Sequence, residues 1–250
     1  MKMKIVILGS GTSVPHPKRT ASAHWLATEK TTLLLDCGAD AAHRMAAHGL
    51  AWEDLGAIWL SHFHLDHIGG LLPFLFGTKY APQTQSRRHP LVIYGPRGTA
   101  LLLQRLDRAN DYDLLDQPFP LEVREVKPDE EFEIGPQLTA RAFKTPHTDE
   151  SLGLRLTDER GRIVVYTSDT GFDEKLATEA QGASLLIIEC SFRRDKPVAT
   201  HLEFNEAAEI AKRAGADKTV LVHLYPEWDD AETNAINGLR LADDGLEIEL

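Results

Sequence analysis

The chain has 250 residues, of which 42% are hydrophobic and 26% are charged. These fractions are typical of globular proteins, and no apolar run approaches the roughly 20 residues that a membrane-spanning helix needs, so a disordered chain and a membrane protein are both disfavoured. The net charge of −11 disfavours broad adhesion to nucleic acid or to anionic membranes.

The first apolar run, Met1 to Leu8, continues into Gly9-Ser10-Gly11 without a small-residue cleavage pattern. We therefore interpret it as a strand and not as a signal peptide, and we expect one cytoplasmic domain over residues 1–250. The two cysteines adjoin apolar runs and are expected to be buried thiols. The basic pairs Lys18-Arg19, Arg87-Arg88 and Arg193-Arg194 are expected on a solvated surface.

Aliphatic and β-branched runs, bounded by Gly, Pro and Asp, predict many strands with a few helices between them. The predicted strands are 4–8, 23–28, 32–35, 57–60, 91–94, 121–126, 138–144, 152–156, 162–167, 185–189 and 219–223, and the predicted helices are 39–48, 68–76, 97–108, 173–180 and 204–214. We interpret the acidic stretch 227–244 as a solvated terminal helix. Two sheets packed face to face with helices outside, a four-layer αββα sandwich of the α/β class, would bury this set.

A doubly wound parallel sheet is the competing architecture, with Gly9-Ser10-Gly11 as a nucleotide-binding loop. The signal for it is weak, because Val14 stands where that motif has its third glycine and the prolines that follow block a helix.

The segment Ser61 to Gly70 is the most informative, because it holds three histidines and an aspartate directly after a predicted strand. If the strand continues into the loop, His62 and His64 point to the same side and offer two nitrogens to one metal ion. Asp66 and His67 follow where the chain turns into the helix expected near Ile68, and they can face a second ion. Zinc favours this mixture of imidazole and carboxylate.

The pattern H-x-H-x-D-H resembles the signature of the metallo-β-lactamase fold hydrolases. That resemblance implies three further ligands at the ends of later strands, which His147, Asp169 and His223 match. It also implies which residues share an ion: His62, His64 and His147 at one, Asp66, His67 and His223 at the other, with Asp169 bridging both.

The implied cofactor is a pair of zinc ions about 3.5–4 Å apart with a bridging hydroxide, manganese or iron being possible instead. His64 occupies the position where diiron electron-transfer members of the family carry glutamate, and an imidazole there favours zinc and hydrolysis.

Other segments resemble the ribonuclease Z branch of this family, namely Leu8 to Pro15, Leu33 to Gly38 and Ile188-Glu189-Cys190-Ser191. The resemblance implies that Glu189 and His201 form a pair in which His201 gives a proton to the leaving oxygen, a contribution of roughly 10²- to 10⁴-fold. Asp66, Glu189 and His201 are thus the expected catalytic residues. Asp36 either hydrogen-bonds a metal-binding histidine or caps a turn.

The chain departs from ribonuclease Z in one place, because only 21 residues separate His147 from Asp169 and they leave no room for an arm that grips transfer RNA. We therefore predict a phosphodiesterase for small or short phosphodiesters such as cyclic nucleotides, without stable nucleic-acid or membrane binding. A homodimer is expected only by analogy. The alternatives are ribonuclease Z-type processing of transfer RNA 3′ ends and acyl hydrolysis of the lactonase, thioesterase or β-lactamase type. A non-enzymatic member would be expected to have lost ligands, and none is lost.

Overall fold

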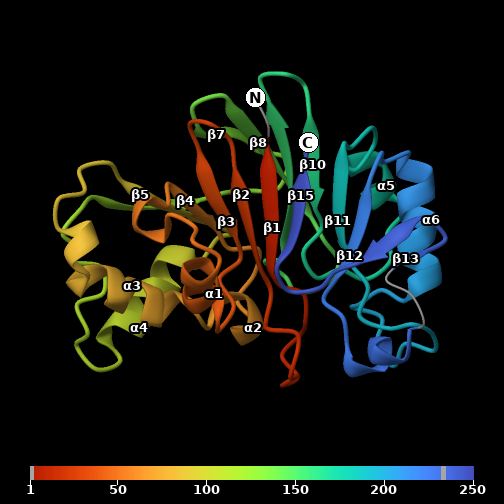
Figure 1. Ribbon diagram of the computed structural model, residues 1–250, viewed down its shortest axis with the longest axis horizontal. Coiled ribbons are helices and arrows are strands. Elements are labelled where there is room, and N and C mark those ends of the chain that lie inside the picture. The colour runs from red at the N-terminus through yellow and green to blue at the C-terminus, as the bar shows by residue number, and fades with distance from the viewer. Residues whose placement is uncertain (1–2, 232–234) are drawn as a thin grey trace.

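Two mixed β-sheets pack face to face and helices cover their outer faces, as the computed structural model shows for residues 3–231 and 235–250 (Figure 1). The predicted four-layer sandwich is confirmed. The first sheet has the order β15-β1-β2-β3-β4-β5-β6, with bounds Leu246–Glu249, Lys4–Gly9, Ala23–Ala27, Thr32–Leu35, Ala57–Trp59, Leu91–Gly95 and Leu121–Glu125. The second has the order β13-β14-β12-β11-β10-β9-β8-β7, with bounds Ala235–Ile236, Leu239–Leu241, Thr219–Val222, Leu185–Glu189, Ile163–Tyr166, Leu152–Asp158, Leu138–Lys144 and Glu131–Gly135.

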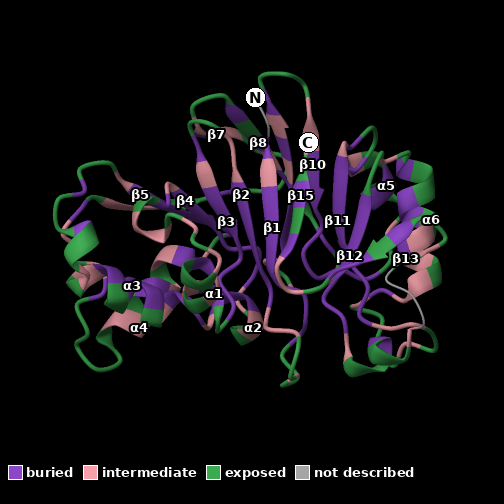
Figure 2. Cartoon of the chain, viewed as in Figure 1, coloured by how far each residue is buried: buried purple, intermediate pink, exposed green. Residues whose placement is uncertain are grey.

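The central strands are apolar on both faces because each sheet lies between two layers. In β3, Leu33 and Leu35 join the core between the sheets, whereas Leu34 packs on the helix side. In β11, Leu186 likewise faces the outer helices while its neighbours face the other sheet. Figure 2 shows these strands buried along most of their length. Continuous aliphatic runs are the expected pattern for strands covered on both sides.

The helices lie in two groups, one on each sheet. The first sheet is covered by α1 (Ala41–Ala47), α3 (Leu71–Tyr80) and α4 (Thr99–Arg108), and the second by α5 (Lys175–Glu179) and α6 (Phe204–Ala214). The short helix α2 (Leu65–Ile68) stands at one edge of the sandwich (Figure 1). The described residues also form three 3-10 turns: Trp52–Asp54, Pro82–Thr84 and Pro226–Asp230. No helix within the described residues is long and apolar enough to cross a bilayer.

Two helix predictions need correction. The helix expected over 68–76 is two helices, α2 and α3, and α2 already begins at Leu65. The helix expected over 227–244 is wrong, because this stretch contains the last 3-10 turn and the strands β13 and β14, while residues 232–234 lie outside the described part. Two alternating leucines of this stretch, Leu239 and Leu241, are buried on the face of the second sheet that α6 covers, and alternation of this kind is typical of a strand.

The strands β7, β13, β14 and β15 were not predicted. They are short, and exposed charged residues alternate along most of them, so their apolar content is low. The two cysteines, Cys37 and Cys190, are buried and free as expected.

Arg87 was expected on the solvated surface and is instead 5% exposed. Its guanidinium donates to the carbonyl oxygens of Glu53, Leu55 and Pro90 and lies 4.4 Å from the ring centroid of Phe119. Burial lowers its pKa to about 10. A single sequence does not distinguish this arginine from its solvated neighbour, because the carbonyl acceptors are supplied by the fold.

The turn between β9 and β10 depends on Asp158, whose carboxylate accepts hydrogen bonds from the backbone of Arg160 and from the backbone and side chain of Arg162. We expect Asp158→Asn to lower the free energy of unfolding by about 1–3 kcal/mol at neutral pH, the usual range for buried bonds to a charged group.

Burial alone raises the pKa of Asp158, but the bonds from Arg162 outweigh it and the net pKa is lowered. The stabilisation should therefore be present above the unfolded-state pKa of about 3.9 and be lost as the pH falls through the folded-state value. Urea unfolding of both proteins at pH 7 and in acid measures this. A difference that persists undiminished in acid would contradict the assignment.

Candidate metal centre

The sandwich brings together all seven residues that the sequence suggests as metal ligands, at one edge where strands end. His62 and His64 follow β4, His147 follows β8, Asp169 follows β10 and His223 follows β12. Because β10, β11 and β12 run parallel, their carboxyl ends meet at one edge. Asp66 and His67 come from α2. The expected continuation of β4 to His64 is not found, since the strand ends at Trp59.

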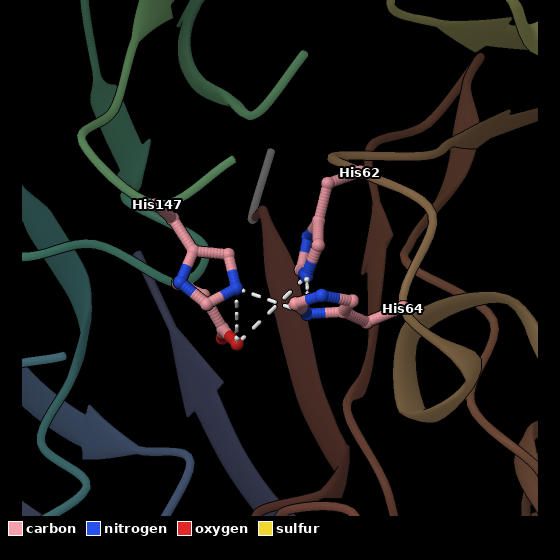
Figure 3. A group of neighbouring side chains, drawn as sticks. His62, His64 and His147 are labelled. Carbon is pink, nitrogen blue, oxygen red and sulfur yellow. Dashed lines mark hydrogen bonds and ion pairs between the residues drawn. The ribbon is translucent and has the colours of Figure 1, made fainter. Parts of the chain in front are cut away.

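Three imidazoles and one carboxylate form the first group. The Nδ1 atom of His64 lies 3.1 Å from Nε2 of His62 and 3.0 Å from Nε2 of His147. The Oδ2 atom of Asp169 lies 3.8 Å and 3.6 Å from those two Nε2 atoms. Figure 3 shows the three rings turned toward one point. His64 offers its Nδ1 nitrogen to this point, whereas the other two histidines offer Nε2.

The second group is built around the same aspartate. Nε2 of His223 lies 3.3 Å from Oδ2 of Asp66 and 3.3 Å from Oδ2 of Asp169. Nε2 of His67 lies 3.2 Å from Oδ1 of Asp169 and 3.8 Å from Oδ2 of Asp66. The two carboxylate oxygens of Asp169 therefore border both groups, as a bridging ligand requires.

Buried polar atoms without partners indicate that these residues fit metal ions. Nε2 of His67 and Oδ1 of Asp169 are buried and 3.2 Å apart, yet neither makes a hydrogen bond of acceptable geometry within the described part of the chain. Orphaned buried polar atoms of this kind are rare in proteins unless an ion or a water completes them. Two nitrogens and two carboxylate oxygens converging on one small volume form a donor set that suits a divalent ion.

The charges of the centre point the same way. Burial lowers the pKa of His67, but the carboxylates of Asp169 and Asp36 raise it well above its usual value. Burial likewise raises the pKa of Asp169, and the imidazoles of His223 and His67 outweigh it, so this pKa falls well below its usual range. The carboxylate is thus ionised, and the centre attracts positive charge.

Two of the candidate histidines also form hydrogen bonds through the ring nitrogen that does not face the cluster. Nδ1 of His67 lies 2.6 Å from Oδ2 of Asp36, and Nδ1 of His147 donates to the carbonyl oxygen of Thr200 at 2.9 Å. Of the two interpretations of Asp36, the structure shows the hydrogen bond to a histidine. Tyr166 donates its hydroxyl to the same Asp36 oxygen at 2.7 Å. Such outer partners fix ring orientation at metal sites.

The backbone turns sharply where three of these strands end. Asp36, Ser168 and His223 have φ values of 57°, 56° and 57°, a left-handed conformation that is uncommon for residues other than glycine. Each follows its strand within two residues. Such strained positions persist where the surrounding structure determines them strongly, and they gather at functional sites.

Glu189 and His201, the expected proton-donor pair, also meet. Nδ1 of His201 lies 2.9 Å from Oε1 of Glu189, which is 1% exposed, and the ring of His201 stacks on that of His223 with centroids 5.3 Å apart. Burial lowers the pKa of His201, but the hydrogen bond and the charge of Glu189 raise it, and the net pKa is above the usual value. The Nε2 nitrogen of His201 is left to carry a proton.

The sequence did not point to Tyr166, Thr200 or Tyr225 as parts of this region. Tyr166 ends an apolar strand like many core tyrosines, and Thr200 contributes only its backbone oxygen, so neither has a pattern that marks it. Tyr225 follows His223 at two residues, and its ring centroid lies 6.5 Å from that of His223. Its position two residues after this suspected ligand, at the end of a predicted strand, was the one sequence feature that could have indicated Tyr225.

The fold and this His/Asp cluster define a metallo-β-lactamase fold hydrolase related to ribonuclease Z. Within that class, the chain belongs to the family described as Anti-Pycsar protein Apyc1, whose model matches residues 3–245.

Among its relatives is the probable metallo-hydrolase YhfI of Bacillus subtilis, 30% identical over 225 residues that cover 89% of this chain and 87% of YhfI. The crystal structure of YhfI matches with a TM-score of 0.82 over 99% of both chains. Ribonuclease Z of Ignicoccus hospitalis is 28% identical over 279 residues, covering 92% of this chain and 90% of that enzyme. The short form of human tRNase Z matches at 25% identity with a TM-score of 0.82 over 98% of both chains.

Proposed function

We propose that the chain is a metal-dependent phosphodiesterase that hydrolyses small phosphodiesters such as cyclic nucleotides. The observation that carries this proposal is the Glu189–His201 pair beside the seven-residue cluster. Membership of the family described as Anti-Pycsar protein Apyc1 supports the further proposal that the chain has an anti-Pycsar role.

In this proposal His62, His64 and His147 hold one divalent ion, Asp66, His67 and His223 hold a second, and Asp169 contacts both. Zinc is the proposed metal, since imidazoles outnumber carboxylates in the set. When bound, such ions supply an activated water and stabilise the negative charge that develops on a phosphodiester in displacement. The chain positions the ions and shields them, because four of the seven residues are buried: His62, His67, Asp169 and His223.

His201 serves as the general acid in this proposal. An alkoxide is a poor leaving group, so protonation of its oxygen lowers the barrier considerably. Glu189 contacts Nδ1 of His201, orients the ring, and raises the pKa of His201 against the effect of burial, which favours the protonated imidazole that a general acid requires. Thioester hydrolysis has less need for this pair, because a thiolate leaves without a proton.

Three observations support a small substrate. The 21 residues between His147 and Asp169 form β9, β10 and their turn, with no arm between them. The alignment with ribonuclease Z of Ignicoccus hospitalis extends over 279 positions, more than the 250 residues of this chain, so that enzyme has residues with no counterpart here. The net charge of −11 also disfavours a long contact with RNA phosphates.

Processing of transfer RNA 3′ ends is the second candidate function, because several ribonuclease Z proteins are among the relatives. Under the proposal above, a precursor transfer RNA binds weakly to the zinc-loaded protein. Tight binding that weakens steeply with added salt would favour this second candidate, since that slope reports phosphate contacts.

The proposed activity is tested with purified protein loaded with zinc or manganese. We expect hydrolysis of bis-p-nitrophenyl phosphate and of at least one 3′,5′-cyclic nucleotide in a panel of purine and pyrimidine members, and loss of both activities on chelation. A lactone and nitrocefin serve as controls for acyl chemistry. Cleavage of either control without cleavage of any phosphodiester would overturn the proposal.

A further inference from the structure

Two buried carboxylates on opposite sheets of the sandwich have the same kinds of hydrogen-bond partner. Asp36 follows β3 and Glu189 ends β11, and they are 0% and 1% exposed. Each accepts a hydrogen bond from one imidazole directly and from one serine hydroxyl, and the same serine contacts a second imidazole. We call these sets the Asp36 network (Asp36, Ser61, His62, His67) and the Glu189 network (Glu189, Ser191, His201, His223).

In the Asp36 network the direction of every bond follows from the number of protons. Ser61 donates its hydroxyl to Oδ2 of Asp36 at 2.8 Å, because an ionised carboxylate only accepts. The hydroxyl has one proton, so Ser61 Oγ can only accept at its second contact, Nδ1 of His62 at 3.0 Å. His62 therefore carries its proton on Nδ1, and the lone pair of Nε2 points at the first group of the cluster.

The Glu189 network repeats the same logic. Ser191 donates its hydroxyl to Oε2 of Glu189 at 2.8 Å, and Nδ1 of His223 lies 3.0 Å from Ser191 Oγ. The hydroxyl proton is already committed to the carboxylate, so His223 must donate from Nδ1. The lone pair of its Nε2 then faces Asp66 and Asp169, where the second ion is proposed.

We propose that Ser61 and Ser191 are positioning residues that hold His62 and His223 in the Nδ1–H tautomer, leaving Nε2 free to bind metal. This inference rests on the proposed function for the presence of the ions, and the bonds within the protein that support it do not involve any ion. Both serines are completely buried, so water does not compete for these bonds.

The two networks differ in what else their carboxylate holds. The imidazole that contacts Asp36 directly is His67, another metal-ligand candidate, whereas the imidazole that contacts Glu189 directly is His201, the proposed proton donor. Loss of Ser61 should therefore affect metal binding alone. Loss of Ser191 should affect metal binding and also loosen Glu189 and His201, because Ser191 Oγ contacts Glu189 and lies 3.3 Å from Nδ1 of His201.

The first test measures zinc affinity by competition with a chromophoric chelator, which does not depend on catalysis. We expect Ser61→Ala and Ser191→Ala each to weaken binding by about 10- to 100-fold, the usual effect of removing an outer partner of a ligand. Ser61→Thr and Ser191→Thr keep the hydroxyl and should retain most of the affinity. Circular dichroism and thermal unfolding establish that each variant is folded.

The second test follows the ring protons of the zinc-loaded protein by ¹H–¹⁵N NMR. We expect slowly exchanging Nδ1–H signals from His62 and His223 in the unchanged protein. The His223 signal should be lost in Ser191→Ala with that of His62 retained, and the reverse should hold in Ser61→Ala. Unchanged zinc affinity in both alanine variants, or zinc on Nδ1 of either ring, would overturn the inference.

The third measurement distinguishes the roles of the two serines by comparing activity on substrates with different leaving groups. With zinc saturating, the activity of Ser191→Ala should fall by a larger factor on a diester with an alkoxide leaving group than on bis-p-nitrophenyl phosphate. Any fall in the activity of Ser61→Ala should be by the same factor on both substrates. If the ratio of the two activities, on the alkoxide diester and on bis-p-nitrophenyl phosphate, is the same in both variants, Ser191 has no special role in proton donation. If the unchanged protein cleaves no phosphodiester, the proposed function fails, while the affinity and NMR results still decide the role of the serines.

Discussion

Replacing Asp169 with asparagine is expected to lower kcat/KM for phosphodiesters by about 10³- to 10⁴-fold or more, since metal ions contribute several kcal/mol to such reactions and each 1.36 kcal/mol is a factor of ten. Asp169 is the one residue whose oxygens border both groups of donors. The substitution keeps the size of the side chain and removes the charge that the two ions would share. Zinc content per chain and kinetics on bis-p-nitrophenyl phosphate measure the effect.

Asp111→Asn is the matched control for this change. Asp111 is exposed and has a φ of 47°, a conformation that asparagine also adopts readily, so this variant should keep full zinc content and activity. If Asp169→Asn retains both zinc ions and most of its activity, Asp169 is not the shared ligand.

Replacing His201 with alanine is expected to lower kcat by about 10²- to 10⁴-fold on a substrate with an alkoxide leaving group. On bis-p-nitrophenyl phosphate the loss should be much smaller, because nitrophenolate leaves without a proton. His43→Ala, which removes an exposed histidine of α1, should change neither rate. Equal losses on the two substrates would show that His201 does not supply the proton.

The pH dependence of the same reaction gives an independent check on His201. The acid acts only while it is protonated, so activity on the alkoxide substrate should fall as the pH rises through the pKa of His201. Because Glu189 raises that pKa against the effect of burial, the fall should come above the ordinary histidine value of about 6.5. His201→Ala should lack this alkaline fall.

The sequence predicts the strands of this fold better than its helix boundaries. Central strands such as β3 and β11 are buried on both faces, so their residues are all apolar and easily found. The start of α2 at Leu65 was missed, because this four-residue helix, Leu65–Ile68, contains Asp66 and His67 and is too short to show apolar periodicity. The strand β14 was missed because its two buried leucines stand among charged residues.

The first four ligand candidates were found because three histidines and an aspartate stand close together after a predicted strand, whereas His147, Asp169 and His223 were located through the resemblance to the metallo-β-lactamase fold hydrolases. Ser61 precedes the ligand candidate His62 and Ser191 lies two residues after Glu189, yet a serine has many ordinary uses and no spacing marks it as the partner of a histidine. Each serine has a partner distant along the chain, Asp36 lying 25 residues from Ser61 and His223 lying 32 residues from Ser191, and only the folded sandwich brings them together. The same applies to Thr200, whose contribution is a carbonyl oxygen.

The proposed phosphodiesterase activity depends on two divalent ions in the His/Asp cluster. It is tested most directly by adding zinc in known amounts to metal-free protein while following hydrolysis of bis-p-nitrophenyl phosphate. The account predicts no hydrolysis without metal and a rise that saturates at two zinc ions per chain. Full activity in the metal-free protein, or two bound zinc ions without hydrolysis of this diester or of any cyclic nucleotide, would contradict it.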